Sequence, residues 1–212
     1  WLPQHQLDLQ TLRSIVRPFV TVYPHAAALL ATHSMETPVI GLVARRDDGP
    51  FDLQQIRSRL TNHLLSIELA EFDIEDELAL LGSFIAGSHA LERFASNAPL
   101  NTDDRPIVAY RAPRITYAPD SLPSERLLAL LDGLDITSEE LLTAVDPALQ
   151  ARLTSYWEAR DRFIEAGRDV VLTSDVRRMV AQVRAPLLDV LRLSPDFRPA
   201  YDPLLHMAIA LG

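Results

Sequence analysis

The sequence predicts an α+β protein that is predominantly helical, with a small α/β portion followed by an all-helical portion. Apolar residues recur every three or four positions over most of the chain, which is the spacing of one helix face. The strand-like runs are short, and the only one after residue 118 is 170–172. Hydrophobic residues make up 48% of the chain and charged residues 23%, so a folded core is expected rather than disorder.

The α/β portion is predicted to alternate helices with strands. Residues 9–18 space their apolar side chains like a helix, and Pro18 should end it because proline lacks the N–H that a helix interior uses. The apolar runs 19–23 and 38–44 are typical of strands. A loop is expected at 45–50, and helices are expected at 52–65, 74–86 and 88–96, the last two separated at Gly87-Ser88.

The segment from Pro99 to Arg114 combines a polar turn, 101–106, with a strand-like run, 107–110. It contains two adjacent acids, Asp103 and Asp104. Asn and Asp favour turns because their side chains bond the nearby backbone. The same carboxylates could hold an amine by charge-assisted hydrogen bonds. The residue types favour a structural role in a turn, and amine binding by the two acids stays open as an alternative.

The all-helical portion is predicted to begin after a linker, Pro119 to Pro123. Thr137 and Glu140 have the spacing of a capping box, and Pro186 should kink or break the helix around it. Asp202 followed by Pro203 is typical of a helix start. Helices are expected at 124–133, 137–145, 147–167, 174–192 and 203–211.

Composition excludes several classes of function. The net charge is −9 and the isoelectric point is near 5.1, which argues against a nucleic-acid partner. All 20 basic residues are Arg, so neither a Schiff-base lysine nor a phosphate-loop lysine is present. The chain has no Cys, which removes thiol nucleophiles and disulfides and fits a reducing compartment.

Motifs for metals and cofactors are also missing from the sequence. None of the six histidines has the spacing of a metal site, and there is no glycine-rich nucleotide loop and no nucleophile elbow. We therefore predict no metal. The chain shows neither a signal-peptide pattern nor an apolar run of about 18 residues, so a cytoplasmic location is expected.

Several segments together resemble a known family. They are Trp1-Leu-Pro followed by a helix, the run from Phe19 through the Tyr23-Pro24 turn, the partner strand 38–44, the motif 101–106 and Tyr110 to Pro113. This order resembles the later half of the spermidine synthase-like (polyamine aminopropyltransferase-like) fold. The closest type is bacterial proteins that fuse a multi-span membrane region to such a domain. The resemblance covers residues 1–117 and implies a partial methyltransferase-like α/β domain.

The resemblance implies that the parent protein is an aminopropyltransferase of polyamine biosynthesis, with a polyamine ligand. The family's cofactor loop and catalytic aspartate would lie before Trp1, so no cofactor and no catalytic residue are expected in this chain, which alone would be inactive. Trp1, Tyr23, Asp103 and Asp104 are the candidate substrate-binding residues at the pocket rim. The expected partners are the upstream half of the parent, with a membrane region if the parent has one, and a second copy of the chain at the exposed sheet edge.

The C-terminal portion, 118–212, has a resemblance of its own. Residues 194–208 look like the first helix of a tetratricopeptide repeat, because Ala200, Tyr201 and Leu204 match its small, aromatic and leucine positions. Leu205 stands where that repeat prefers glycine. This resemblance supports an alternative function, a non-catalytic helical module that binds a partner protein.

Overall fold

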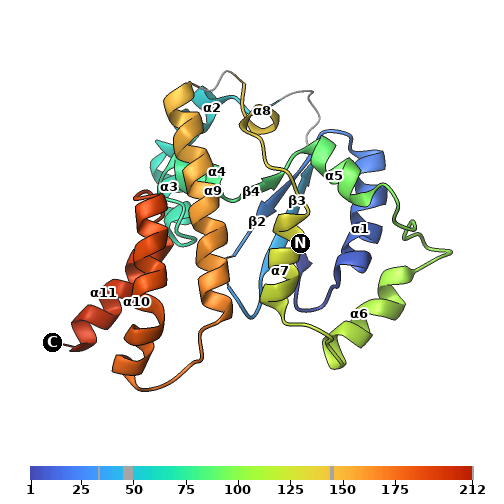
Figure 1. The fold of residues 1–212 in the computed structure, drawn as a ribbon. Coiled ribbons are helices and arrows are strands. Elements are labelled where there is room, and N and C mark those ends of the chain that lie inside the picture. The colour runs from blue at the N-terminus through green and yellow to red at the C-terminus, as the bar shows by residue number, and fades with distance from the viewer. Residues whose placement is uncertain (33, 45–49, 144–145, 212) are drawn as a thin grey trace. The chain divides into compact units, whose positions relative to one another are not determined.

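The computed structural model describes residues 1–32, 34–44, 50–143 and 146–211. The chain forms two compact units that interleave along the sequence. The first contains Trp1–Ile56 and Ser83–Ala144, and the second contains Arg57–Gly82 and Val145–Gly212. The predicted domain boundary at residues 117 and 118 lies inside the first unit, and the domain division itself stays a prediction. The structure is α+β and mostly helical, which confirms the predicted class (Figure 1).

The first unit contains a four-stranded antiparallel sheet in the order β1-β3-β2-β4. The predicted strand at 38–44 is confirmed as β3, which pairs with β2 so that Ala28 lies opposite Leu42. The strands are β1 (Leu2–Pro3), β2 (Ala26–Leu30), β3 (Val39–Ala44) and β4 (Phe84–Ala86). The helices of this unit include α1 (Leu9–Val22), α5 (Ser88–Ala95), α6 (Ile107–Tyr117), α7 (Pro123–Asp132) and α8 (Ser138–Leu141).

Helix α1 continues through Pro18, so the predicted helix end and the predicted strand at 19–23 are both wrong. Pro18 cannot donate to the carbonyl of Ser14, and that carbonyl instead accepts from the Asn101 backbone N–H at 3.4 Å. The buried face of α1 also extends past the proline, since Leu12, Val16 and Val20 follow one another at four-residue intervals. Tertiary contacts therefore outweigh the local preference of proline.

The segment 74–86, which was predicted to be one helix, contains a short helix and a strand. It becomes the short helix α4 (Glu77–Gly82), which belongs to the second unit, and strand β4, which pairs with β2. Phe84, Ile85 and Ala86 are almost completely buried. A short apolar run of this kind does not distinguish a buried strand from a helix by periodicity.

The predicted closing strand at 107–110 is also wrong, because these residues begin helix α6. The Asn101 side chain explains the start of this helix. Its Oδ1 accepts from the Val108 backbone N–H at 3.0 Å, which satisfies a donor of the first helical turn. The predicted helix at 52–65 likewise divides into α2 (Leu53–Leu60) and α3 (His63–Ala70), because the Asn62 side chain caps α3.

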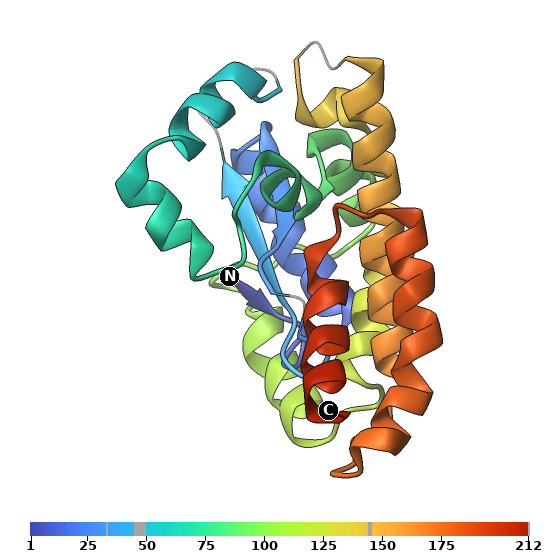
Figure 2. The ribbon, with the colours of Figure 1, turned by 90° about the vertical axis from the view of Figure 1, so that its left-hand side faces the viewer.

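The second unit is all helical in the part that the structure describes. The helices predicted at 147–167, 174–192 and 203–211 are confirmed as α9 (Pro147–Arg168), α10 (Val176–Leu193) and α11 (Tyr201–Leu211). A 3₁₀ turn, Arg198–Ala200, precedes α11. Helix α10 packs against both α9 and α11, and Figure 2 shows these helices from the side. Pro186 lies inside α10 without ending it.

The strand-like run 170–172 is not a strand. The side-chain amide of Gln182 accepts from the Val171 N–H at 2.9 Å and donates to the Val171 carbonyl at 3.0 Å. One side chain thus supplies both hydrogen bonds that a neighbouring strand would otherwise make. The helix predicted at 137–145 is shorter than expected, because α8 ends at Leu141 and Leu142 is extended. Residues 144–145 and residues 45–49 of the predicted loop lie outside the described residues. Among the described helices, none is long and apolar enough to cross a membrane.

Candidate functional site

The four candidate rim residues lie on separate elements of the first unit. Trp1 precedes β1, is 86% exposed and lies beside the backbone of Gly41. Tyr23 ends α1, with its ring centroid 5.1 Å from that of Phe19. Asp103 and Asp104 are exposed in the loop between α5 and α6. Among the described contacts none joins these four residues, and none of them lines the pockets described below. Their role in substrate binding stays a prediction.

The motif 101–106 forms a tight turn. The backbone N–H of Thr102 donates to the carbonyl of Arg105 at 3.2 Å, and the N–H of Arg105 returns a bond of 3.0 Å to the carbonyl of Thr102. Asp103 and Asp104 are the residues between these two partners. Asn101 and Thr102 therefore direct their polar groups to the backbone, whereas both carboxylates face solvent. This arrangement accounts for the turn and leaves an amine-binding role for the acids open.

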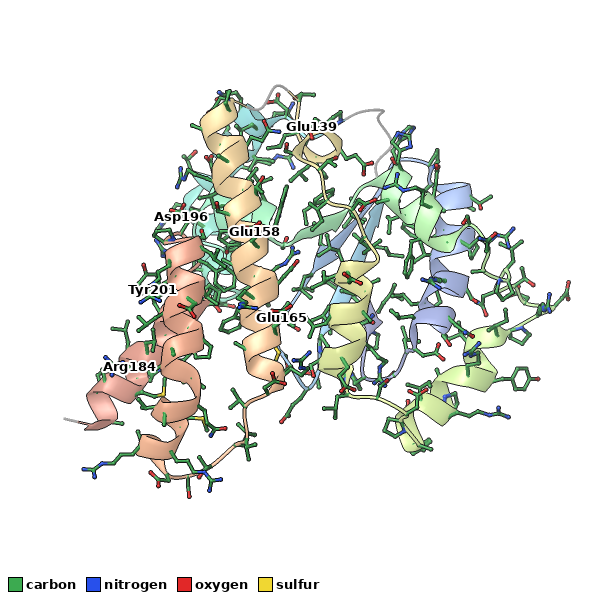
Figure 3. All side chains as sticks on the ribbon, viewed as in Figure 1. Glu139, Glu158, Glu165, Arg184, Asp196 and Tyr201 are labelled. Atoms are coloured by element: carbon green, nitrogen blue, oxygen red, sulfur yellow. The ribbon has the colours of Figure 1, made fainter. Side chains whose placement is uncertain are left out.

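A pocket of about 250 Å³ in the first unit is lined by both histidine and glutamate side chains, and we call it the His25–Glu140 pocket. It lies where β2 begins, where α5 begins and where α8 ends. Its ionisable and polar lining residues are His25, Ser88, His89, Glu139 and Glu140. Figure 3 labels Glu139, which belongs to the short helix α8. Histidines and carboxylates close together can bind cations or exchange protons.

Backbone pairing positions two walls of this pocket. The Phe51 N–H donates to the Leu141 carbonyl at 2.7 Å, and the Thr143 N–H donates to the Phe51 carbonyl at 3.1 Å. Phe51 and Leu142 thus form an isolated parallel bridge. The bridge holds the segment after residue 50 against the end of α8, which places Glu140 beside the start of α5.

Glu140 is the most distinctive group in the pocket. A side chain at Gly87 would overlap its carboxylate, so the close approach requires glycine. The Oε2 atom of Glu140 is buried and has no hydrogen-bond partner among the described residues. An unpaired buried carboxylate oxygen is costly, and a bound cation or hydrogen-bond donor would remove that cost.

The sequence predicted a different role for Glu140. It was expected to complete a capping box with Thr137, but the Thr137 side chain makes no cap hydrogen bond. The contact with Gly87 was missed because these residues are far apart in the chain. The only signal in the sequence was the helix break predicted at Gly87-Ser88, which marks the same backbone position.

The second unit has an apolar groove between α10 and α11. A cavity of about 330 Å³ is lined by Val180, Arg184, Leu188, Leu204, Met207 and Ala208. A shallower hollow continues along α10 past Arg177 and Ala181. Figure 3 labels Arg184 on α10 and Tyr201 at the start of α11. We call this surface the α10–α11 groove.

Two aromatic side chains with polar groups, Tyr156 and Trp157, are buried in the second unit. Trp157 donates its indole N–H to the Leu81 carbonyl at 3.2 Å. Burial raises the pKa of Tyr156 to about 12, so this phenol stays neutral at physiological pH. The Trp157 indole thus satisfies the Leu81 carbonyl near the end of α4, and neither side chain titrates near neutral pH.

Metal-binding geometry is absent from the described residues, where no group of three or more His, Cys, Asp or Glu side chains could hold an ion. Comparison with known proteins found no match among protein-family models, curated proteins or solved structures.

Proposed function

We propose that this chain is the C-terminal portion of a spermidine synthase-like protein whose whole form transfers aminopropyl groups to an amine. The supporting observation is the order of elements around the Tyr23-Pro24 turn. Helix α1 leads to that turn, and β2 and β3 then form an antiparallel hairpin. The family resemblance implies a helix, this turn and a hairpin partner strand in the same order, but it also places a strand at 19–23, where α1 continues. The proposal also includes a methyltransferase-like origin for the first unit and a tetratricopeptide-like origin for the helical tail.

The His25–Glu140 pocket supplies a role for this chain within such a protein. His25 follows directly after the Tyr23-Pro24 turn, and the pocket adds two carboxylates, Glu139 and Glu140. A protonated amine would give Glu140 Oε2 the partner that it lacks. In this proposal the pocket recognises the cationic end of the amine substrate, and the upstream half of the parent supplies the cofactor and the catalytic base.

Putrescine titration of the chain tests this proposal. Two charge-assisted hydrogen bonds contribute about 1.5–3 kcal/mol each, so a dissociation constant in the millimolar range is expected. Putrescine should shift the ring NMR signals of His25 and His89 saturably, and Glu140→Gln should abolish the shift. Decarboxylated S-adenosylmethionine should produce no heat at micromolar concentration, because the sequence has no glycine-rich loop.

A charge-matched control is available on α9. Glu158 is exposed in the second unit, so Glu158→Gln removes the same charge without touching the pocket. Equal loss of putrescine binding in the Glu158→Gln and Glu140→Gln variants would contradict the pocket. Micromolar binding of the decarboxylated cofactor would show a complete site in this chain and would contradict the proposal as a whole.

A second candidate function is peptide binding by the helical tail, and the α10–α11 groove favours it. Its floor is apolar, and Arg177 and Arg184 lie along its length. Charge complementarity therefore selects an acidic amphipathic helix as the occupant. A labelled model helix of about 16 residues, with leucines on one face and glutamates elsewhere, should bind with micromolar affinity at low salt.

Fluorescence anisotropy distinguishes this groove from a non-specific surface. Arg184→Glu should weaken binding of the model helix by about tenfold or more, whereas Arg162→Glu on the exposed face of α9 should not. Equal binding of a version with lysines in place of glutamates would contradict the proposal. Dimerisation of the chain through the groove in light scattering would also contradict it.

A further inference from the structure

The first unit has a second concave surface, which we call the arginine pocket. It has a volume of about 540 Å³ and lies among α1, α5 and α6. Each of these helices contributes one guanidinium group, from Arg13, Arg93 and Arg111 respectively. Helix α1 contacts both α5 and α6, and Figure 1 shows the three helices together. The three cations therefore come from α1 and from two helices that both pack on it.

Arg111 is held in place by α1. Its Nη1 donates to Gln10 Oε1 at 2.9 Å, and its Nη2 donates to Asp8 Oδ2 at 2.7 Å. Burial alone would raise the pKa of Asp8, but hydrogen bonds from Thr11 and the charge of Arg111 outweigh that effect and lower it. Asp8 thus stays ionised and fixes the guanidinium of Arg111 at the pocket wall.

The guanidinium groups of Arg13 and Arg93 are held less firmly than that of Arg111. The guanidinium carbon of Arg13 lies 4.8 Å from the ring centroid of Phe94, a cation–π contact that leaves its N–H groups available. Arg13 makes no ion pair among the described residues. Arg93 pairs with Asp135 at 3.0 Å, but both side chains are exposed, and an exposed pair of this kind is readily exchanged for another anion.

The arginine pocket is positively charged, whereas the chain as a whole is negatively charged. Arg17 also reaches this region, since its Nη1 donates to the Ala98 carbonyl. Four guanidinium groups therefore accompany two carboxylates, Asp8 and Asp135, which leaves a net local charge of +2 in a chain whose net charge is −9. A concave cationic surface on an acidic protein attracts anions selectively.

We propose that the arginine pocket binds a phosphate monoester, with its phosphoryl group between Arg13, Arg93 and Arg111. Planar guanidinium groups match phosphoryl oxygens with paired N–H donors. A phosphoryl dianion has three terminal oxygens, one for each guanidinium, whereas a carboxylate has two. The volume exceeds that of a phosphate ion, and Asn97 and Pro99 line the space left for the organic part.

Calorimetry on the full chain at low salt tests the site, with glycerol 3-phosphate as the probe. A dissociation constant of about 10–100 μM is expected from several charge-assisted hydrogen bonds. Binding should tighten as pH rises through about 6, where the phosphoryl group loses its second proton. Arg13→Gln and Arg93→Gln should each weaken binding by about tenfold or more. Both residues are exposed, so the variants should retain the circular dichroism spectrum of the parent chain.

Matched controls define the outcomes. Arg192→Gln removes an exposed arginine of the second unit and should leave affinity unchanged. Inorganic phosphate and succinate should each bind at least about tenfold more weakly than glycerol 3-phosphate. Equal affinity for inorganic phosphate would overturn the assignment to a monoester, and equal affinity for succinate would overturn the assignment to a phosphoryl group. Absence of saturable binding up to about 5 mM, or unchanged affinity in Arg13→Gln, would overturn the site itself.

This inference is independent of the proposed function. The arginine pocket shares no residue with the His25–Glu140 pocket, and its ligand has the opposite charge. Failure of the phosphate titration would leave the putrescine result unaffected, and the reverse also holds.

Discussion

Replacing Arg160 with alanine is expected to lower the free energy of unfolding by about 3–4 kcal/mol. The side chain is 0% exposed, and its Nη1 donates to the carbonyl of Gly82 at 2.9 Å while its Nε donates to Asp161 at 2.8 Å. Truncation would leave a cavity inside the helical unit and a buried carbonyl without its donor. Both effects destabilise the folded state, and urea denaturation followed by circular dichroism measures them together.

The adjacent helix face provides the control for Arg160. Arg162 is exposed and pairs with Glu165 three residues later, so Arg162→Ala should change the free energy of unfolding by less than about 0.5 kcal/mol. Arg160→Met keeps most of the side-chain volume and should lose less stability than Arg160→Ala, because both changes remove the same polar contacts but methionine leaves a smaller cavity. Equal stability of Arg160→Ala and Arg162→Ala would show that the buried guanidinium does not support the fold.

Replacing Gly82 with alanine is expected to destabilise the protein by about 3 kcal/mol, near the upper end of overpacking effects. A methyl group at this position would overlap the ring of Tyr156. That ring is buried and packs edge-on against Phe197, with centroids 5.1 Å apart, so it has little room to move. Thermal unfolding should show the loss as a lower melting temperature.

Gly133 provides a matched glycine for this experiment. A methyl group there would meet only the carbonyl oxygens of Ala129 and Leu130, at 3.4 and 3.5 Å. Its φ of −85° suits alanine, so Gly133→Ala should be neutral or stabilising by up to about 1 kcal/mol. Combining Gly82→Ala with Tyr156→Ala should cost less than the sum of the two single changes, because the second removes the overlap. Additive losses would contradict steric conflict as the cause.

The incorrect sequence predictions share a physical cause. Residues 19–22, 84–86 and 107–110 are short apolar runs whose local preference is compatible with either a helix or a strand. Each is decided by a partner far away in the sequence. The Ser14 carbonyl accepts a hydrogen bond from the Asn101 backbone N–H, and strand β4 pairs with β2. The Asn101 side chain accepts from a backbone N–H in the first turn of α6.

The candidate sites show the same limitation. Trp1, Tyr23, Asp103 and Asp104 came from a family resemblance, and the described contacts do not join them. Glu140 and Gly87 are in contact because α8 lies against the start of α5. Arg13, Arg93 and Arg111 line one pocket because α5 and α6 both pack on α1. Residue type alone does not reveal a charge cluster whose members are this far apart in the chain.

The amino-acid sequence was sufficient to predict the class of the fold, the strand at 39–44 and four helices of the C-terminal portion, which are α7, α9, α10 and α11. These elements have regular apolar spacing over long segments, or a β-branched run that favours one conformation. The length of α1, the identity of β4 and α6, and the walls of both pockets were apparent only in the folded molecule. Those features depend on hydrogen bonds and burial between distant segments, which contribute more free energy than the propensities of a few residues.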